Sequence, residues 1–192
     1  GCPFEEGDSG SPIFNESGKV VGFGGRIIKS DEDSAKYINS PETRIYSKSK
    51  TLYGLNFAKD SIRSNDSVLL VEGYMDVVSL FQSDVKNVVA SSGTALTEEQ
   101  VNLISRYTKN IFLLYDADLA GIKAAKRGIE IILEQGLNIK VVTLPNGEDP
   151  DSFIKGKGKK EFDKHLNNSQ SIILFISSLY MQEGKMSTPE EK

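Results

Sequence analysis

Carboxylate pairs follow three apolar segments of the chain, and these side chains have the clearest capacity for chemistry. The segments span residues 68–71, 111–115 and 139–144. The carboxylates after them are, in order, Glu72 and Asp76, Asp116 and Asp118, and Asp149 and Asp151. Residues i and i+2 of an extended chain point to the same side, so the second and third pairs would each present two carboxylates on one face. Converging carboxylates repel one another unless a cation neutralises them, so the pattern indicates a divalent-metal site.

The ligand types narrow the choice of metal. Carboxylate oxygens favour Mg²⁺, Mn²⁺ or Ca²⁺, whereas zinc prefers histidine and cysteine. The chain has one histidine, His165, and one cysteine, Cys2. Mg²⁺ held by a few carboxylates usually shares its coordination shell with substrate phosphates. The sequence therefore predicts phosphoryl or nucleotidyl transfer with one or two metal ions.

The same carboxylates also have a purely structural explanation. An acidic residue near the start of a helix often serves only as a cap. Asp76 falls in the first turn of the helix predicted over residues 75–83, where negative charge is favourable. For Glu72 and Asp76 taken alone, helix capping and metal binding are equally good explanations. Three unrelated acidic surface turns would produce the same residues.

The elements that position these side chains alternate between strand and helix from residue 68 to residue 144. Short, wholly apolar strands are typical of a parallel sheet covered on both faces. The alternation predicts a doubly wound parallel α/β unit, in which ligands bind beyond the carboxyl ends of the strands. Glu72 would lie at that edge, and Gly73 would permit the sharp turn that follows it.

Helix signals within this unit are clear. Thr97 followed by Gln100 forms a capping box at the start of one helix. A longer helix is predicted over residues 119–135, with Gly136 ending it in the usual C-terminal position. Residues 152–166 predict short helices with five lysines, whose basic face is by default a solvated surface.

The N-terminal third has a different pattern. Residues 12–14 and 19–26 flank a turn-rich tetrapeptide and predict a β-hairpin, whose glycines favour close approach by a strand or a nucleic-acid backbone. Residues 29–40 are polar and predict a loop. Residues 49–61 predict a short helix with Gly54 as a weak point.

Composition sets outer limits on function. The 192 residues are 38% hydrophobic and 26% charged, with a net charge of −4, which suits one or two globular domains. A single cysteine excludes an internal disulfide, and no apolar run approaches the roughly 18 residues that span a membrane. Residues 15–63 hold nine basic and six acidic residues, a small surplus that suits phosphate contact and an ordinary surface equally well.

The order of the acidic motifs resembles the Toprim domain, which is shared by bacterial primases, type IA and II topoisomerases, recombination mediators and a class of nucleases. The flanking residues resemble bacterial replicative primases of the DnaG type in particular. The matching motifs are GFGGR at 22–26, KYINSPET at 36–43, LYGL at 52–55, VEGYMDVV at 71–78, YDAD at 115–118 and GEDPD at 147–151.

This resemblance implies a Toprim fold: a doubly wound parallel sheet flanked by helices. It also implies a partial N-terminal α+β basic subdomain and a C-terminal helical subdomain. The corresponding domains would span residues 1–65, 66–148 and 149–192. The zinc-binding module and the helicase-binding domain of primases are not expected within the chain.

By the same resemblance, the protein would be a DNA-directed RNA polymerase of the primase type, a nucleotidyltransferase that makes short RNA primers during replication. Its partners would be single-stranded DNA, ribonucleoside triphosphates, the RNA primer and, through the domain outside the chain, the replicative helicase, with no membrane partner. Mg²⁺ would be the cofactor, with Mn²⁺ as a substitute and zinc only in the absent module. The expected location is the bacterial cytoplasm, in association with the nucleoid.

The resemblance also implies roles for single residues. The catalytic residues and leading metal ligands would be Glu72, Asp116 and Asp118. The acidic cluster would be completed by Asp76, Asp149 and Asp151. The contacts to nucleotide phosphates or template would be Arg26, Lys36 and Lys48. Two ions would activate the primer 3′-hydroxyl and stabilise the departing pyrophosphate, with partial general-base action by Glu72 as the alternative.

Two other interpretations stay open. The first is a different Toprim enzyme, either a nuclease or a topoisomerase fragment, although a topoisomerase needs a nucleophilic tyrosine in a separate domain. The second is a nucleic-acid-binding or partner-binding module without catalysis. With Mg²⁺, ribonucleotides and single-stranded DNA, a product longer than the substrate would support priming and shortened DNA a nuclease. Retained binding without Mg²⁺-dependent turnover, unchanged by Glu72→Gln, would favour the non-catalytic module.

Overall fold

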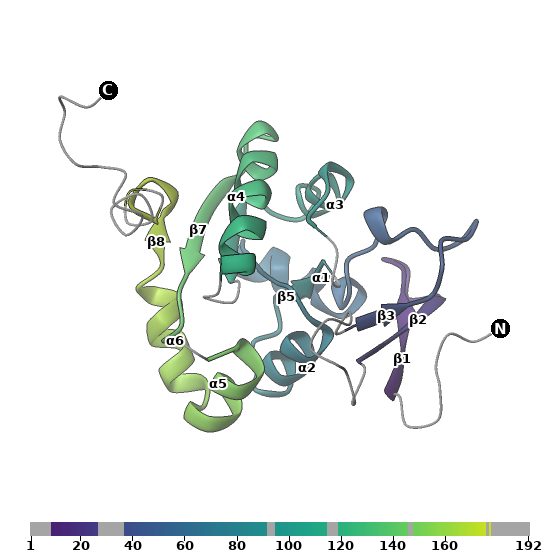
Figure 1. Cartoon of the computed structure of the whole chain (residues 1–192), viewed down its shortest axis with the longest axis horizontal. Helices are drawn as coiled ribbons and strands as arrows, with labels where there is room; N and C mark the ends of the chain where they lie inside the picture. The colour runs from purple at the N-terminus through teal and green to yellow at the C-terminus, as the bar shows by residue number, and fades with distance from the viewer. Residues whose placement is uncertain are drawn as a thin grey trace.

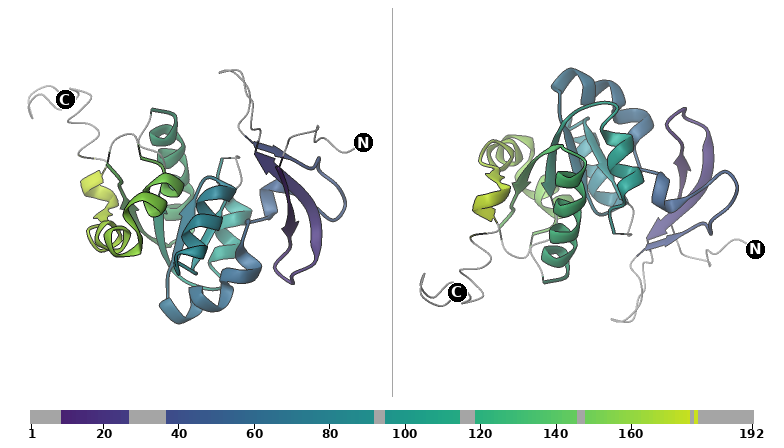
Figure 2. Two further views of the ribbon diagram at one scale, coloured as in Figure 1. Left: turned by 90° about the horizontal axis from the view of Figure 1, so that it is seen from below. Right: turned by 90° about the horizontal axis from the view of Figure 1, so that it is seen from above.

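The computed structural model describes residues 9–26, 37–91, 95–114, 119–145, 148–175 and 177. These residues form a five-stranded sheet enclosed by helices and a separate three-stranded sheet beside it (Figures 1 and 2). None of the helices within these ranges is both long and apolar enough to cross a membrane.

The five-stranded sheet has the order β5-β4-β6-β7-β8. Four strands are parallel, namely β4 (Val68–Val71), β5 (Val88–Ala90), β6 (Asn110–Leu114) and β7 (Asn138–Val142), while β8 (Gln170–Ser171) pairs antiparallel with β7. The helices that follow the parallel strands are α2 (Tyr74–Gln82), α3 (Glu98–Ile104), α4 (Leu119–Glu134), α5 (Pro150–Lys157) and α6 (Lys159–Asn167). The predicted doubly wound parallel α/β unit is confirmed.

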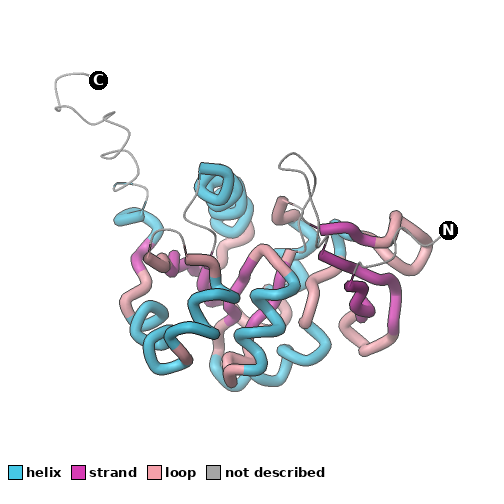
Figure 3. Tube along the Cα trace, turned by 60° about the horizontal axis from the view of Figure 1, so that its bottom comes forward, coloured by secondary structure: helices cyan, strands magenta, loops and turns pink. Residues whose placement is uncertain are grey.

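Burial explains why these strands are apolar throughout. Every residue of β4 is buried, with Val68 and Leu70 in one apolar core and Leu69 and Val71 in the other. The first core also receives buried side chains from α1 (Leu55–Asn65), α3 and α4, and the second receives them from α2, α5 and α6. Helices therefore cover both faces of the sheet, as Figure 3 shows.

The three-stranded sheet is antiparallel, with the order β1 (Ser9–Phe14), β2 (Val20–Arg26) and β3 (Tyr37–Asn39). The predicted β-hairpin is confirmed, and the Asn15 side chain closes its turn by accepting the N–H groups of Ser17 and Lys19. The loop predicted for residues 29–40 is wrong over β3, which pairs with β2. The pairing is made by backbone hydrogen bonds, and the sequence of β3 has no alternation of apolar and polar residues that would predict a strand.

The segment before the parallel sheet also differs from its prediction. Residues 48–50 form a short 3₁₀ helix, η1 (Lys48–Lys50), and α1 begins only at Leu55. Gly54 is not inside the helix but caps it with a φ of 84°, a left-handed conformation that glycine adopts readily. A Cβ at this position would also lie 2.9 Å from Cγ1 of Val77. Gly136, which follows α4, has a φ of 68° as its predicted stop position requires.

Candidate active site at the carboxyl edge of the parallel sheet

Glu72 directly follows β4, at the edge of the sheet where ligands of such folds bind. The chain passes from β4 to β5 on one side and later to β6 on the other, so β4 and β6 flank the point where the strand order reverses. The two strands are neighbours, with Leu70 opposite Leu113. The Glu72 side chain is half-buried, and its Oε1 is shielded from solvent.

The predicted residues that follow β6 cannot be placed in the same way. Asp116 and Asp118 lie outside the described residues, as does Lys36, and the side chain of Arg26 is not described. What the structure does show is that β6, which leads into Asp116, ends beside β4. Adjacent strands lie about 4.8 Å apart, so the carboxyl ends of β4 and β6 lie at one corner of the sheet.

Asp76 has a structural role that can be seen directly. It is the third residue of α2, and its Oδ2 accepts the backbone N–H of Gly73 at 3.0 Å. Only 9% of the residue is exposed. Asp76 therefore holds the turn after Glu72. Gly73 itself has a φ of −107°, which any residue adopts. The prediction that the backbone of this turn needs a glycine is therefore wrong.

The third acidic pair is arranged differently from its prediction. Asp149 is the N-cap of α5, where its Oδ1 accepts the N–H of Ser152 at 2.7 Å. Asp151 is already inside the helix, accepts a hydrogen bond from the Ser79 hydroxyl of α2 and lies 2.6 Å from Nζ of Lys155. The expected extended pair with both carboxylates on one face is wrong, because a helix begins between the two residues and turns their side chains apart.

These carboxylates do not complete a cation site by themselves. Among the residues that the structure describes, no group of three or more histidine, cysteine, aspartate or glutamate side chains could hold a metal ion. Asp76 and Asp149 are engaged in capping, and Asp151 has a lysine beside it.

The three-stranded sheet packs against the start of α2, which is next to Glu72. Tyr74 donates a hydrogen bond to Oδ1 of Asn39 in β3, and its ring lies 4.5 Å from that of Tyr53 between centroids. A Cβ added to Gly24 would lie 2.7 Å from the Tyr74 ring. The glycines of the hairpin were predicted to let a strand or a nucleic-acid backbone approach its backbone closely. At Gly24 the approaching group is a tyrosine, which the sequence signal could not identify.

Two hydrogen bonds hold the backbone of Lys48. Its own N–H donates to Oε1 of Glu42 at 2.7 Å, and its carbonyl accepts from the buried amide of Gln100 at 3.0 Å. A few residues later, the backbone of Tyr53 pairs with Ala90, the last residue of β5. The capping box of Thr97 and Gln100 was predicted, but the reach of Gln100 to η1 was not.

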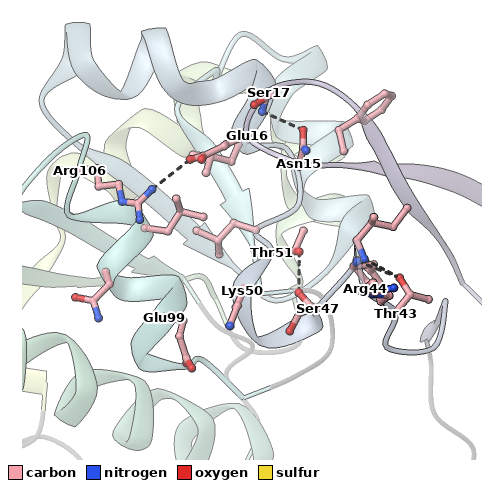
Figure 4. A pocket seen from close by; sticks show the side chains of 17 residues that line it. Asn15, Glu16, Ser17, Thr43, Arg44, Ser47, Lys50, Thr51, Glu99 and Arg106 are labelled. Carbon is pink, nitrogen blue, oxygen red and sulfur yellow. Dashed lines mark hydrogen bonds and ion pairs between the residues drawn. The ribbon is translucent and has the colours of Figure 1, made fainter.

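A pocket of about 630 Å³ lies between the hairpin turn, the segment around η1 and α3 (Figure 4). Its charged lining is mixed, and Arg106 extends toward Glu16, with Nη1 3.6 Å from Oε2. Tyr46 lies in its wall, where burial, with a smaller contribution from Glu42, raises its pKa to about 12. Of the predicted metal ligands, those that the structure describes, Glu72, Asp76, Asp149 and Asp151, do not line this pocket.

Comparison with known proteins identifies the family. Residues 69–154 match the model of a Toprim-like family, and residues 11–59 match the model of the DNA primase catalytic core, N-terminal domain. The chain is 49% identical to a DNA primase of Clostridium acetobutylicum over 163 residues, which is 84% of the chain. The chain belongs to the DnaG-type family of bacterial DNA primases.

Solved primase structures agree with this assignment. The zinc-binding and RNA polymerase domains of the Aquifex aeolicus primase are 44% identical with a TM-score of 0.80, and the match covers 91% of this chain and 43% of that one. A DnaG primase catalytic domain bound to single-stranded DNA is 38% identical with a TM-score of 0.82, covering 95% and 59%. The chain spans only 27% of the C. acetobutylicum primase.

Proposed function

We propose that this chain carries the catalytic centre of a DNA primase, which joins ribonucleotides into short RNA primers on single-stranded DNA. One observation carries the proposal: Glu72 lies at the switch point of the parallel sheet, beside the strand that leads into Asp116 and Asp118. The primase relatives supply the reaction class, and the structure bound to single-stranded DNA supports the template.

Glu72, Asp116 and Asp118 would hold divalent cations at this edge, with Mg²⁺ favoured by the oxygen ligands. When bound, such ions would neutralise a triphosphate and promote ionisation of the attacking primer hydroxyl. The half-buried position of Glu72 limits its motion. Asp76 accepts the N–H of Gly73 and so holds the backbone directly after Glu72.

The remaining acidic and basic residues would tune this centre. Asp149 and Asp151, at the start of α5, would add negative charge to the acidic cluster beside their structural roles, in which Asp149 caps the helix and Asp151 pairs with Lys155. Arg26, Lys36 and Lys48 would contact the phosphates of nucleotide or template, which requires cations close to the metal site. Partial general-base action by Glu72 is the alternative to pure metal binding.

Nucleotide incorporation tests this proposal. The protein is incubated with Mg²⁺, labelled ribonucleoside triphosphates and single-stranded DNA, and Glu72→Gln serves as the matched variant. RNA product that requires both Mg²⁺ and Glu72 supports a primase. Shortened DNA would support a nuclease instead. DNA binding without turnover, unchanged in Glu72→Gln, would support a non-catalytic module.

A further inference from the structure

The Gln100 side chain joins the N-terminal segment to the parallel sheet unit and is completely buried. Its Nε2 donates to the carbonyl oxygens of Lys48 at 3.0 Å and Thr51 at 2.9 Å. Its Oε1 accepts the N–H of Thr97 at 3.2 Å. Both amide protons and the amide oxygen are therefore used, and removing a partner would leave buried polar groups unsatisfied.

A second link lies beside the first. The Thr97 hydroxyl donates to the carbonyl oxygen of Ser49 at 2.6 Å. Together, Thr97 and Gln100 hold three backbone carbonyls in and just after η1 against the start of α3. A helix cap needs only the bonds between Thr97 and Gln100, so the three bonds to η1 exceed what capping requires.

Lys48 is the residue of η1 that this arrangement affects most. Glu42 fixes its N–H and Gln100 fixes its carbonyl, so the backbone is held on both sides. Within the described part of the chain, its ammonium group forms no ion pair. A cation on a fixed backbone loses less conformational freedom when it meets an anion than one on a mobile loop does.

We propose that Gln100 is a positioning residue, which holds Lys48 in place to contact a nucleic-acid phosphate at the carboxyl edge of the sheet. The inference rests on the proposed function, because it takes Lys48 as a phosphate contact. A purely structural Gln100 would stabilise the fold without any particular dependence on Lys48. The two roles differ in whether the effects of the two residues on binding are coupled.

A double-mutant cycle separates them. The four proteins are the wild type, Gln100→Leu, Lys48→Ala and the double variant, and a fluorescent single-stranded oligonucleotide reports affinity over a series of salt concentrations. Lys48→Ala is expected to reduce the salt slope by about 0.7, the value of one phosphate contact on a single strand. Gln100→Leu is expected to weaken binding by about threefold or more alone, but by less than about twofold in the Lys48→Ala background.

Two further variants make the result decisive. Asn102→Ala changes an exposed amide on the same helix and is expected to leave affinity unchanged. Gln100→Glu keeps the acceptor for Thr97 and removes both donors to η1, so it replaces Gln100→Leu if circular dichroism shows that the leucine variant is unfolded. It is expected to weaken binding by a similar factor and with the same dependence on Lys48.

Equal weakening by Gln100→Leu in both backgrounds, or unchanged affinity in Gln100→Glu, would overturn the positioning role. An unchanged salt slope in Lys48→Ala would instead remove Lys48 from the phosphate contacts and the inference with it. The primase proposal would survive either result, because it is judged by Mg²⁺-dependent incorporation and its loss in Glu72→Gln.

Discussion

The turn from β4 to α2 and the turn from β7 to α5 carry similar residues but use them differently. In the first, Asp76 caps the helix from within its first turn and leaves Glu72 at the sheet edge. In the second, Asp149 is itself the cap and Asp151 pairs with Lys155. Both turns are acidic, but only the first lies at the switch point between β4 and β6. Position in the sheet therefore distinguishes Glu72, the central candidate ligand, from the carboxylates that hold the helices.

The two turns also differ in what packs on them. The three-stranded sheet lies against the first turn, where Tyr74 contacts Gly24 and Asn39. Asp149, in the second turn, is exposed to solvent. We therefore expect substitutions near the first turn to affect both catalysis and folding, and those near the second turn to have smaller effects.

The largest effect is expected for Glu72→Gln. Loss of its charge should reduce Mg²⁺-dependent nucleotide incorporation by more than about 100-fold, since even outer-shell partners of a metal are typically worth 10–100-fold. Asp149→Asn keeps the capping oxygen, so the factor by which its activity falls should be at least about tenfold smaller than the factor for Glu72→Gln. Equal losses in the two variants, measured under the same conditions, would show that the two turns are not functionally distinct.

Gly24→Ala and Gly156→Ala should change stability in opposite directions. The new methyl at residue 24 would press on the Tyr74 ring and is expected to cost about 1–3 kcal/mol. At residue 156, in α5, a Cβ would meet nothing within 4 Å, so alanine should stabilise the helix by about 0.5–1 kcal/mol. Urea unfolding measures both, and a stable Gly24→Ala variant would argue against tight packing at the first turn.

Alkaline pH should weaken the packing around the three-stranded sheet. Tyr46 lies against Gly22 of β2, and its pKa is raised from 10.0 to about 12. Between these values the unfolded chain releases the proton and the folded chain keeps it, so the free energy of unfolding should fall as pH rises, by at most about 1.4 kcal/mol per pH unit.

Tyr46→Phe provides the control for this pH dependence. Its free energy of unfolding should decline less steeply between about pH 10 and 12, the window set by the two pKa values. Some decline should remain, because burial also raises the pKa of Tyr53 and Tyr107. Identical slopes in the wild type and Tyr46→Phe would contradict the assignment of this titration to Tyr46.

The smallest effect concerns the cap of α5. Asp149→Ala removes the acceptor for the Ser152 N–H and should cost about 0.5–1 kcal/mol, while Asp149→Asn should cost almost nothing. Because asparagine removes the charge but keeps the cap, a fall in Mg²⁺ affinity in Asp149→Asn, measured by calorimetry, would identify Asp149 as a ligand as well. A loss of stability in both variants would mean that the charge itself holds the turn.

Local patterns predicted much of this fold. The apolar runs before Glu72 and Asp116 are strands of one parallel sheet, and the Thr97–Gln100 capping box and the stop at Gly136 are where the sequence placed them. These features depend on residues close together in the chain. Glu72 directly follows such an apolar run, so the sequence alone predicts its position at the edge of the sheet.

Contacts between distant segments could not be predicted in this way. The strand β3 exists because its backbone pairs with β2, and the need for glycine at residue 24 comes from Tyr74, fifty positions away. The sequence also could not separate capping from metal binding at Asp76 and Asp149, because both roles use a carboxylate at the start of a helix. The domain boundaries and the roles of the site residues remain predictions.

The position of bound cations tests the central claim most directly. Crystals of the protein soaked in Mn²⁺ should show an anomalous peak within about 2–2.5 Å of a Glu72 carboxylate oxygen, the usual range for hard cations, with Asp116 or Asp118 as a further ligand. The account would be contradicted if, at saturating Mn²⁺, cations bound only elsewhere and Glu72 and the residues after β6 lay on separate sides of the edge.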